Sequence, residues 1–334
     1  MRVNAWAAAA LDPEPGLVVH WPAAFESSGI AGMAGLSRPE RDDGAFDAVL
    51  AALYAHPFKI RRPAEQRVPF VFASPHSGRL YPSSFAAQSR LDALCLRRSE
   101  DAYADELFAG AVTQGAPMIA ARFPRAFLDV NRAPTELDPA LFDGPLAVRV
   151  DTPNARVHAG LGVIPRIVRD GAEIYRVKLH PGEAQERLSR LHRPYHAALA
   201  RLVEETMARF GVAIVIDCHT MPSAASVPDI VLGDRYGAAA SPLLIRSAEA
   251  AFATAGFSVA RNAPYAGGYT THLYGRPEIC VHALQIEINR TLYLDEERIE
   301  PGANYALVQR RLNEALLALT RIDLGPVRPA FAAE

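Results

Sequence analysis

Two histidines follow apolar segments of the kind that form buried strands. His76 comes directly after VPFVFASP (68–75), and His219 follows VAIVIDC (212–218). A neutral imidazole at a rigid strand end can bind zinc with little movement. A single histidine among the ten of this chain is more often a structural or surface residue. Because these two stand at the ends of two strong strands, His76 and His219 are the best candidate metal ligands.

A catalytic zinc site usually has three protein ligands, one of them often a carboxylate, and one open position. Glu100 and Asp101, at the start of a helix expected over 99–114, are the candidates for this carboxylate. Acidic residues in a first helical turn also stabilise the helix dipole, and the pattern alone favours neither role. We assign no metal-binding role to three histidines of a helical, solvated-looking stretch, namely His180, His192 and His196.

Glu287 lies inside an apolar strand expected over 280–289. Strand alternation places it on one face with Gln285 and Asn289. A carboxylate in a central strand is costly unless it is paired or used in chemistry. One interpretation is a salt bridge, for example with Arg290. The other is a general base that takes a proton from an attacking water.

Two arginines flank the segment AFLDVN (126–131), whose end is polar. Arg125 precedes this segment, while Asn131 and Arg132 close it. An arginine fork binds a carboxylate through two parallel hydrogen bonds, and it can also stabilise an oxyanion. The alternative for each arginine is an ordinary structural or surface ion pair.

Alternating strands and helices must position these side chains. We expect strands over 68–74, 117–122, 126–131, 212–220, 257–261 and 280–289. We expect helices over 99–114, over 183–210 with a kink near Pro194 and an end at Gly211, over 240–255 and over 303–320, with a loop-rich stretch at 132–170. The pattern predicts an α/β fold with a mixed, largely parallel sheet covered by helices on both faces. Ligands of such sheets bind beyond the carboxyl ends of the strands.

Composition excludes several classes of function. The 334 residues are 50% hydrophobic and carry a net charge of −2 with both signs interspersed, so no nucleic-acid partner is expected. No apolar run is long enough for a membrane span, and no signal peptide is expected. The three widely spaced cysteines predict reduced thiols in a cytoplasmic protein. There is no nucleotide-binding glycine motif and no G-x-S-x-G element, which leaves Ser77 a weak nucleophile candidate.

Several separate motifs, in order and at fitting spacing from about residue 55 to 320, resemble the N-formylglutamate amidohydrolase family. They are ASPHSGRLYP (73–82), RRSEDAYADELF (97–108), FPRAFLDVNRAPTELDP (123–139), GLGVIPR (160–166), IDCHTMPS (216–223), DIVLGDRYG (229–237), APYAGGYTTHLYGRP (263–277) and LQIEINRTLYLDE (284–296). The resemblance divides the chain into an N-terminal extension, 1–45, and a catalytic domain, 46–334. It implies a single three-layer α/β/α domain like that of zinc carboxypeptidases.

The resemblance also implies a reaction, the hydrolysis of N-formyl-L-glutamate to formate and L-glutamate in histidine degradation. It implies one Zn²⁺ ion, or another divalent metal, held by His76, Asp101 and His219, with Glu100 as the fallback for the carboxylate. By the same resemblance Glu287 is the base. The carboxylate cannot come from an H-x-x-E motif as in the wider carboxypeptidase group, because Ser77, Gly78 and Arg79 follow His76.

For the substrate, the resemblance implies that Asn131 and Arg132 hold the α-carboxylate and that Arg125 steadies the oxyanion. Arg166 is the candidate cation for the substrate side chain. A departure lies at Thr271-His272-Leu273, where an arginine is expected in close relatives. The alternatives are a zinc enzyme acting on another N-acyl amino acid or a peptide C-terminus, and a non-catalytic ligand-binding relative. The sequence carries no signal of oligomeric state.

Overall fold

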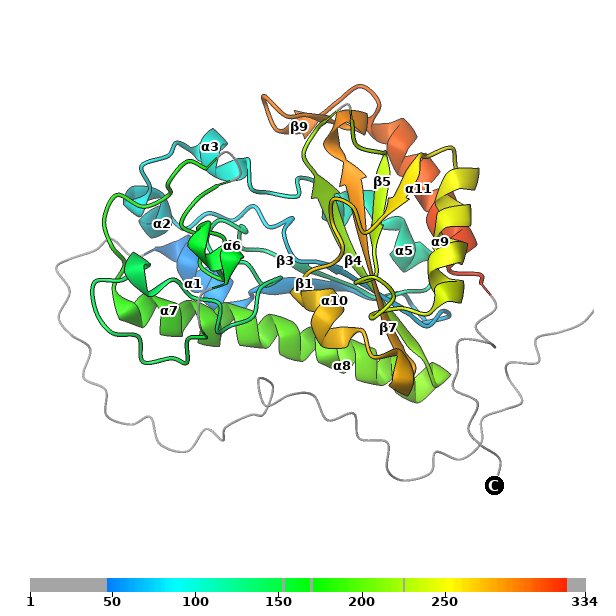
Figure 1. Ribbon diagram of the computed structural model, residues 1–334, viewed down its shortest axis with the longest axis horizontal. Helices are drawn as coiled ribbons and strands as arrows, with labels where there is room; N and C mark the ends of the chain where they lie inside the picture. Colours follow the sequence, from blue (N-terminus) through cyan, green and yellow to red (C-terminus); the bar gives the residue numbers. More distant parts are fainter. Residues whose placement is uncertain (1–46, 152–153, 169–170, 225, 323–334) are drawn as a thin grey trace, which may run out of the picture. The chain divides into compact units, whose positions relative to one another are not determined.

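A computed structural model describes residues 47–151, 154–168, 171–224 and 226–322 (Figure 1). The extension expected over 1–45 lies outside the described residues. Within the described ranges, no helix has the length and apolar character needed to cross a membrane.

A seven-stranded sheet forms the centre, in the order β1-β3-β2-β4-β7-β5-β6. Its strands are β1 (Phe58–Arg61), β2 (Phe70–Ser74), β3 (Met118–Ala121), β4 (Ala213–Met221), β5 (Ile230–Gly233), β6 (Val259–Arg261) and β7 (Val281–Asn289). β3, β2, β4 and β7 run parallel, whereas β1 pairs antiparallel with β3 and β5 with β7. Every residue of β2, β4 and β7 is buried, which explains their continuous apolar runs. The predicted mixed, largely parallel sheet is confirmed.

Helices cover both faces of this sheet. Figure 1 shows α8 and α10 on one side and α9 and α11 on the other. The helices are α1 (Ala48–Ala55), α2 (Ser83–Gln88), α3 (Ala93–Arg97), α4 (Ala104–Leu107), α5 (Gly110–Thr113), α6 (Ala155–His158), α7 (Pro181–Arg187), α8 (Arg193–Phe210), α9 (Pro242–Thr254), α10 (Tyr269–Tyr274) and α11 (Tyr305–Leu319). A short ribbon of β8 (Leu294–Asp295) and β9 (Glu300–Pro301) precedes α11. Ile214, Ile216 and Cys218 of β4 pack into the same core as Leu244 of α9 and Leu312 of α11. The other face of β4, which carries Asp217 and His219, is therefore left for polar chemistry.

The kinked helix expected over 183–210 is present as two helices. A π-helical turn at Leu188–His192 joins α7 to α8, and Pro194 follows it in the first turn of α8. Proline has no N–H to continue the helical ladder, which accounts for the break. Gly211 ends α8 in the left-handed region at φ 69°, as expected of a C-terminal glycine. The helices expected near 240–255 and 303–320 are confirmed as α9 and α11.

Two predicted elements are wrong. The helix expected over 99–114 is two short helices, α4 and α5, and Tyr103 before them has a left-handed backbone at φ 64°. The segment 126–131 forms turns instead of a strand, because its backbone bonds locally. Phe127 N donates to Pro124 O at 3.0 Å, and the Asp129 carboxylate accepts from Asn131 N at 2.8 Å. Such local bonds compete with strand pairing.

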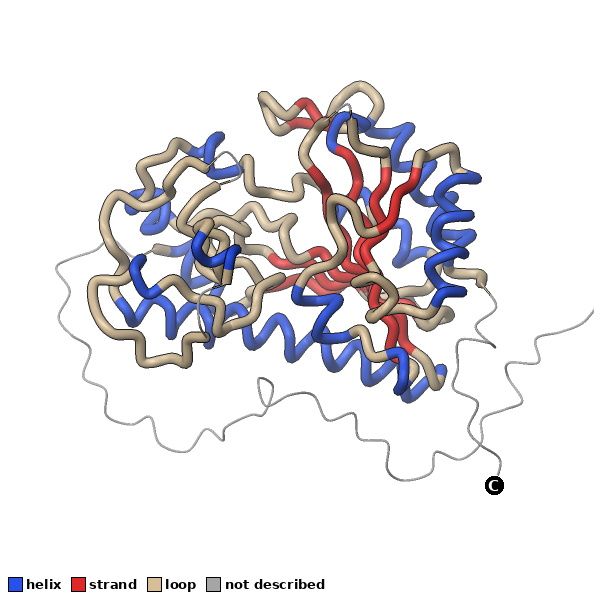
Figure 2. The backbone as a smooth tube through the Cα atoms, viewed as in Figure 1, coloured by secondary structure: helices blue, strands red, loops and turns tan. Residues whose placement is uncertain are grey.

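The predicted loop-rich stretch at 132–170 is confirmed in its described part, and Figure 2 shows that most of the chain between β3 and α7 is loop. Strands β1 and β5 were not expected from the pattern. Both are four residues long. β1 (FKIR) alternates apolar and basic residues and β5 (IVLG) is a very short apolar run, so neither stands out from the sequence.

Candidate active site

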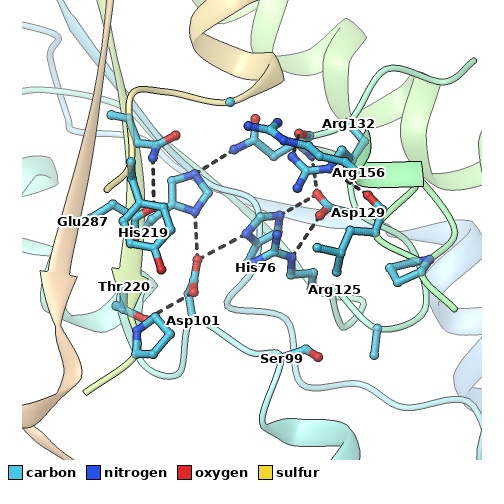
Figure 3. Close-up of a pocket in the computed structure, with 18 of the residues that line it drawn as sticks. His76, Ser99, Asp101, Arg125, Asp129, Arg132, Arg156, His219, Thr220 and Glu287 are labelled. Carbon is cyan, nitrogen blue, oxygen red and sulfur yellow. Dashed lines mark hydrogen bonds and ion pairs between the residues drawn. The ribbon is translucent and has the colours of Figure 1, made fainter. Parts of the chain in front are cut away.

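Two histidines and one aspartate converge at the carboxyl ends of β2 and β4. One ligand atom from each of His76, Asp101 and His219 can be chosen so that all three lie within 4.8 Å of one another. Both imidazoles turn the same nitrogen to the same carboxylate oxygen: Asp101 Oδ2 lies 3.2 Å from His76 Nδ1 and 2.8 Å from His219 Nδ1. All three side chains are buried. Figure 3 shows them facing one another.

The backbone explains this convergence. β2 and β4 are parallel neighbours, so their carboxyl ends meet at one edge of the sheet. His76 lies two residues beyond β2, and His219 lies near the end of β4. Asp101 N donates to His76 O at 3.0 Å, which ties the loop carrying the aspartate to the end of β2.

Each imidazole is oriented by a second carboxylate on its far side. His76 Nε2 lies 2.7 Å from Asp129 Oδ1, and His219 Nε2 lies 2.9 Å from Asp217 Oδ2. In metal sites a ligating histidine usually bonds such a partner through its other nitrogen, which sets both its tautomer and its orientation. Asp129 and Asp217 therefore leave the two Nδ1 atoms directed at the centre of the cluster.

Asp101 is supported in the same way. Its Oδ1 accepts from Arg290 Nη2 at 3.1 Å and from Thr220 Oγ1 at 3.2 Å, so its Oδ2 remains turned to the histidines. Burial raises the pKa of Asp101, but hydrogen bonds from His219 and His76 outweigh it and hold this pKa well below its usual value. The carboxylate is therefore ionised at neutral pH, as a metal ligand must be.

These donors fit a divalent cation. Two imidazole nitrogens and one carboxylate oxygen are a zinc ligand set that leaves one position open. Burial lowers the pKa of His219, but the charges of Asp217 and Asp101 more than offset it and raise this pKa well above its usual value. A cation bound between the imidazoles and Asp101 would supply the positive charge that the buried carboxylates require.

Glu100 is excluded from this cluster by its contacts. Its carboxylate accepts from Tyr81 Oη at 2.8 Å and from Arg97 Nε at 3.1 Å. Asp101 is thus the acidic residue of the adjacent pair that faces the histidines. Neither residue begins a helix, so the helix-dipole interpretation is wrong for both.

Glu287 lies beside the cluster on β7. It is 7% exposed, and its Oε1 accepts from Gln285 Nε2 at 2.8 Å. Burial raises its pKa to about 7, although the charge of His219 opposes this effect. A carboxylate with a pKa near neutrality can both take and return a proton. The alternative interpretation of a salt bridge with Arg290 is not supported, because that arginine pairs with Asp101 and Glu296.

The candidate site opens into a cavity of about 440 Å³. Its charged and imidazole lining residues are His76, Arg98, Asp101, Arg125, Asp129, Arg132, Arg156, His219, Glu287 and Arg290. Of the three arginines predicted for the site, Arg125 and Arg132 line the cavity. Arg125 Nε donates to Asp129 Oδ2 at 2.9 Å. Arg132 donates to Leu161 O and Asn131 O, each at 3.0 Å, which uses two of the five N–H donors of its guanidinium group.

Asn131 lines the cavity too, but both ends of its amide are engaged within the protein. Its Nδ2 lies 3.2 Å from Asp217 Oδ2, and its Oδ1 accepts from Thr270 N at 2.8 Å. These bonds link the end of the 126–131 segment to β4 and to α10. Asn131 therefore contributes to the orientation of the carboxylate behind His219.

Arg166 is not one of the residues that line the cavity, although its chain neighbours Pro165 and Ile167 are. Its guanidinium pairs with Glu173 at 3.3 Å and with Asp138 at 3.6 Å. The structure thus does not bring Arg166 to the other predicted site residues. Arg156, which the sequence analysis did not single out, lines the cavity instead.

His192 and His196 are buried, contrary to the solvated stretch expected for them. His192 Nε2 lies 2.9 Å from Arg132 O, and His196 Nε2 lies 2.8 Å from Val130 O. Since a carbonyl only accepts, each Nε2 carries the proton. His192 of the π-helical turn and His196 of α8 therefore hold the backbone on both sides of Asn131.

Asp129 and Asp217 are the site residues that sequence reasoning left without a role. Each is a single carboxylate inside an apolar run, FLDV and IVID, and this is the signal that singled out Glu287. Asp129 and Asp217 could therefore be found from the sequence in the same way as Glu287. Arg156 has no such signal, because it stands in a loop-rich region.

The chain is similar to a known protein family, to two named enzymes and to solved structures. The family model described as N-formylglutamate amidohydrolase matches residues 68–294. The N-formylglutamate deformylase of Pseudomonas aeruginosa is 33% identical over 271 residues, which cover 76% of this chain and 95% of that protein. The enzyme of the same name from Pseudomonas putida is 29% identical over 266 residues, covering 75% and 93%.

Solved structures agree with these matches. A crystal structure of N-formylglutamate amidohydrolase from Ralstonia eutropha JMP134 superposes with a TM-score of 0.75 at 36% identity, covering 79% of this chain and 97% of that one. The crystal structure of gene product Atu2144 from Agrobacterium tumefaciens has a TM-score of 0.56 at 18% identity, which shows a shared fold alone.

Proposed function

Because this chain belongs to the N-formylglutamate amidohydrolase family, we propose that its cavity hydrolyses N-formyl-L-glutamate to formate and L-glutamate. One observation carries the proposal for the site. His76 Nδ1, His219 Nδ1 and Asp101 Oδ2 converge in a cavity that Glu287 also lines. A metal-ligand set next to a carboxylate of near-neutral pKa is what amide hydrolysis by water requires.

We propose one Zn²⁺ ion, or a related divalent cation, as the cofactor held by His76, Asp101 and His219. When bound, such an ion polarises the formyl carbonyl and acidifies a water at its open position. The buried carboxylates Asp129 and Asp217 hold the two imidazoles in place for it.

The proton transfers fall to Glu287. Its carboxylate takes a proton from the attacking water while the oxygen of that water bonds to the formyl carbon. The same proton then passes to the amide nitrogen as the C–N bond breaks, which releases formate and the free amine of glutamate. A pKa of about 7 suits both transfers, because neither protonation state is strongly favoured at neutral pH.

Arg125 and Arg132 bind charged groups of the substrate. Arg125 steadies the oxyanion that forms when water adds to the formyl group, and one such donor is typically worth about 3–4 kcal/mol. Arg132 binds the α-carboxylate with the N–H donors that its main-chain contacts leave available. Asn131 acts behind these groups as a positioning residue, since its amide is bonded to Asp217 and Thr270.

A related zinc enzyme acting on another N-acyl amino acid is the second candidate function. The reason for considering this candidate is that Thr271-His272-Leu273 lacks the arginine expected in close relatives. These three residues, however, are not among those that line the cavity. They belong to α10, where Thr271 and Leu273 are buried and His272 is exposed. The departure therefore gives this candidate little structural support.

We propose that the reaction takes place in the cytoplasm and is a step of histidine degradation. The partner of the protein is its substrate, a small N-acyl amino acid. Cys95, Cys218 and Cys280 form no disulfide with one another, which supports a reducing compartment.

Formate release tests the proposed function. The purified protein should release formate from N-formyl-L-glutamate, much less acetate from N-acetyl-L-glutamate, and no formate after treatment with a chelator. Addition of Zn²⁺ should restore the activity. A protein that cleaves the acetyl compound as well as the formyl compound would support the second candidate instead. Full activity in protein shown to be free of metal would contradict the mechanism.

A further inference from the structure

Beside Arg125 and Arg132, which the mechanism uses, three further arginines line the cavity: Arg98, Arg156 and Arg290, the last of which pairs with Asp101. Arg156 stands on α6 and lines the cavity together with Arg125 and Arg132. Figure 3 draws Arg156 close to Arg132. Burial lowers the pKa of Arg132, and the positive charges of Arg125 and Arg156 act in the same direction, while Asp129 opposes them. The three guanidinium groups thus share one positively charged part of the cavity.

The contacts of Arg156 differ from those of its neighbours. Arg125 is paired with Asp129, and Arg132 is bonded to two main-chain carbonyls. Among the residues that the structure describes, the guanidinium of Arg156 has neither a hydrogen-bond acceptor nor an acidic partner, and the residue is exposed. Within the described ranges, nothing therefore occupies the five N–H donors of this guanidinium, and they can bind a ligand in the cavity.

The proposed substrate has two carboxylates and needs two cations. Arg132 meets the α-carboxylate, and the carboxylate of the side chain would lose its hydration in the cavity without a second partner. The fork of an arginine matches a carboxylate through two parallel hydrogen bonds. Arg166 cannot serve without giving up Glu173 and Asp138, and it does not line the cavity.

We propose that Arg156 binds the side-chain carboxylate of the substrate and so makes the enzyme selective for acidic N-acyl amino acids. This inference rests on the proposed function and deepens it, because it assigns the specificity of the same cavity to one residue. Since the ligand of Arg156 is the side chain, its loss should spare substrates whose side chain is neutral.

The test compares two substrates of nearly the same shape. N-formyl-L-glutamine replaces the side-chain carboxylate of N-formyl-L-glutamate by a neutral amide. Formate release is measured as kcat/KM on both substrates for wild type, Arg156→Gln and Arg149→Gln. Arg149 is the matched control, because it is an exposed arginine that pairs with Asp151 and does not line the cavity.

We expect Arg156→Gln to lower kcat/KM on the glutamate substrate by about 10- to 100-fold, the range for a hydrogen bond to a charged group. On the glutamine substrate the change should stay within about 3-fold, so the preference for glutamate collapses. Arg156→Lys should recover part of this preference, and Arg149→Gln should keep all of it.

Equal losses on both substrates in Arg156→Gln would overturn the inference, because they would indicate a structural role. An unchanged preference would overturn it as well, and so would a preference that collapses in Arg166→Gln but not in Arg156→Gln. These results all leave formate release by wild type intact. If wild type releases no formate from either substrate, the proposed function is wrong, and the inference that rests on it is wrong as well.

Discussion

Glu287 stands directly across the parallel β4–β7 ladder from His219, as its register partner. One strand thus carries a metal-ligand candidate and its neighbour carries the candidate base. Since strands in a sheet lie about 5 Å apart, this pairing fixes the base at the edge of the His76–Asp101–His219 cluster.

The role of Glu287 predicts the outcome of Glu287→Gln. The variant should bind metal as wild type does, because Glu287 is not one of the three converging ligands. Its kcat should fall by about 10²- to 10⁴-fold, the usual contribution of a general base. Metal analysis and formate release measure the two effects. A variant with normal kcat would rule out the base.

The role of Arg132 predicts a dependence on the α-carboxylate. Arg132→Ala should lower kcat/KM on N-formyl-L-glutamate by about 10- to 100-fold, mainly through KM. The matched substrate is N-formyl-4-aminobutyrate, which lacks the α-carboxylate and on which wild type and variant should differ little. If KM and kcat on the full substrate are both unchanged, Arg132 does not bind this carboxylate.

The carboxylates behind the histidines predict a change in metal affinity. Asp129→Asn and Asp217→Asn should each weaken binding of Zn²⁺ by about 10- to 100-fold, because they remove the charge that orients His76 or His219. Competition with a chromogenic chelator measures this affinity. Asp295→Asn is the control, since Asp295 caps a turn outside the cavity. Equal affinities in all four proteins would refute the assignment.

His192 predicts a loss of stability in acid. Burial lowers its pKa from 6.5 to about 4. Between these pH values the unfolded chain binds a proton at this residue and the folded protein does not. The free energy of unfolding should therefore fall as the pH drops from about 6.5 to 4, by roughly 3 kcal/mol from this residue alone.

Denaturant unfolding with a chelator present measures this slope without a contribution from metal release. His192→Gln keeps a donor for Arg132 O but cannot titrate. The slope of its unfolding free energy against pH should therefore be smaller than that of wild type, by the equivalent of up to one bound proton. His158→Gln, at an exposed position, should retain the wild-type slope. A wild-type slope in His192→Gln would show that this histidine is not a buried neutral group.

Residues in regular strands were the most predictable part of the site. His76, His219 and Glu287 could be found because polar residues next to or inside continuous apolar runs are costly without a purpose. The order of those strands in the sheet then brings the three together. For the same reason the type of fold could be predicted, while short edge strands such as β1 could not.

Loop residues were less predictable, because their direction depends on contacts distant in sequence. Glu100 and Asp101 are adjacent, and only the bond from Asp101 N to His76 O and the contacts of Glu100 with Tyr81 and Arg97 separate their roles. Arg156 and Arg166 lie in one loop-rich region with no periodicity, so no pattern could tell which lines the cavity.

Metal content of two matched amide variants tests the central claim most directly. Wild-type protein should hold one Zn²⁺ per chain, Asp101→Asn should lose it because an amide is a poor zinc ligand, and Glu100→Gln should keep it. His76→Ala and His219→Ala should also lose the ion. An Asp101→Asn protein that is folded and still holds a full zinc ion would contradict the account.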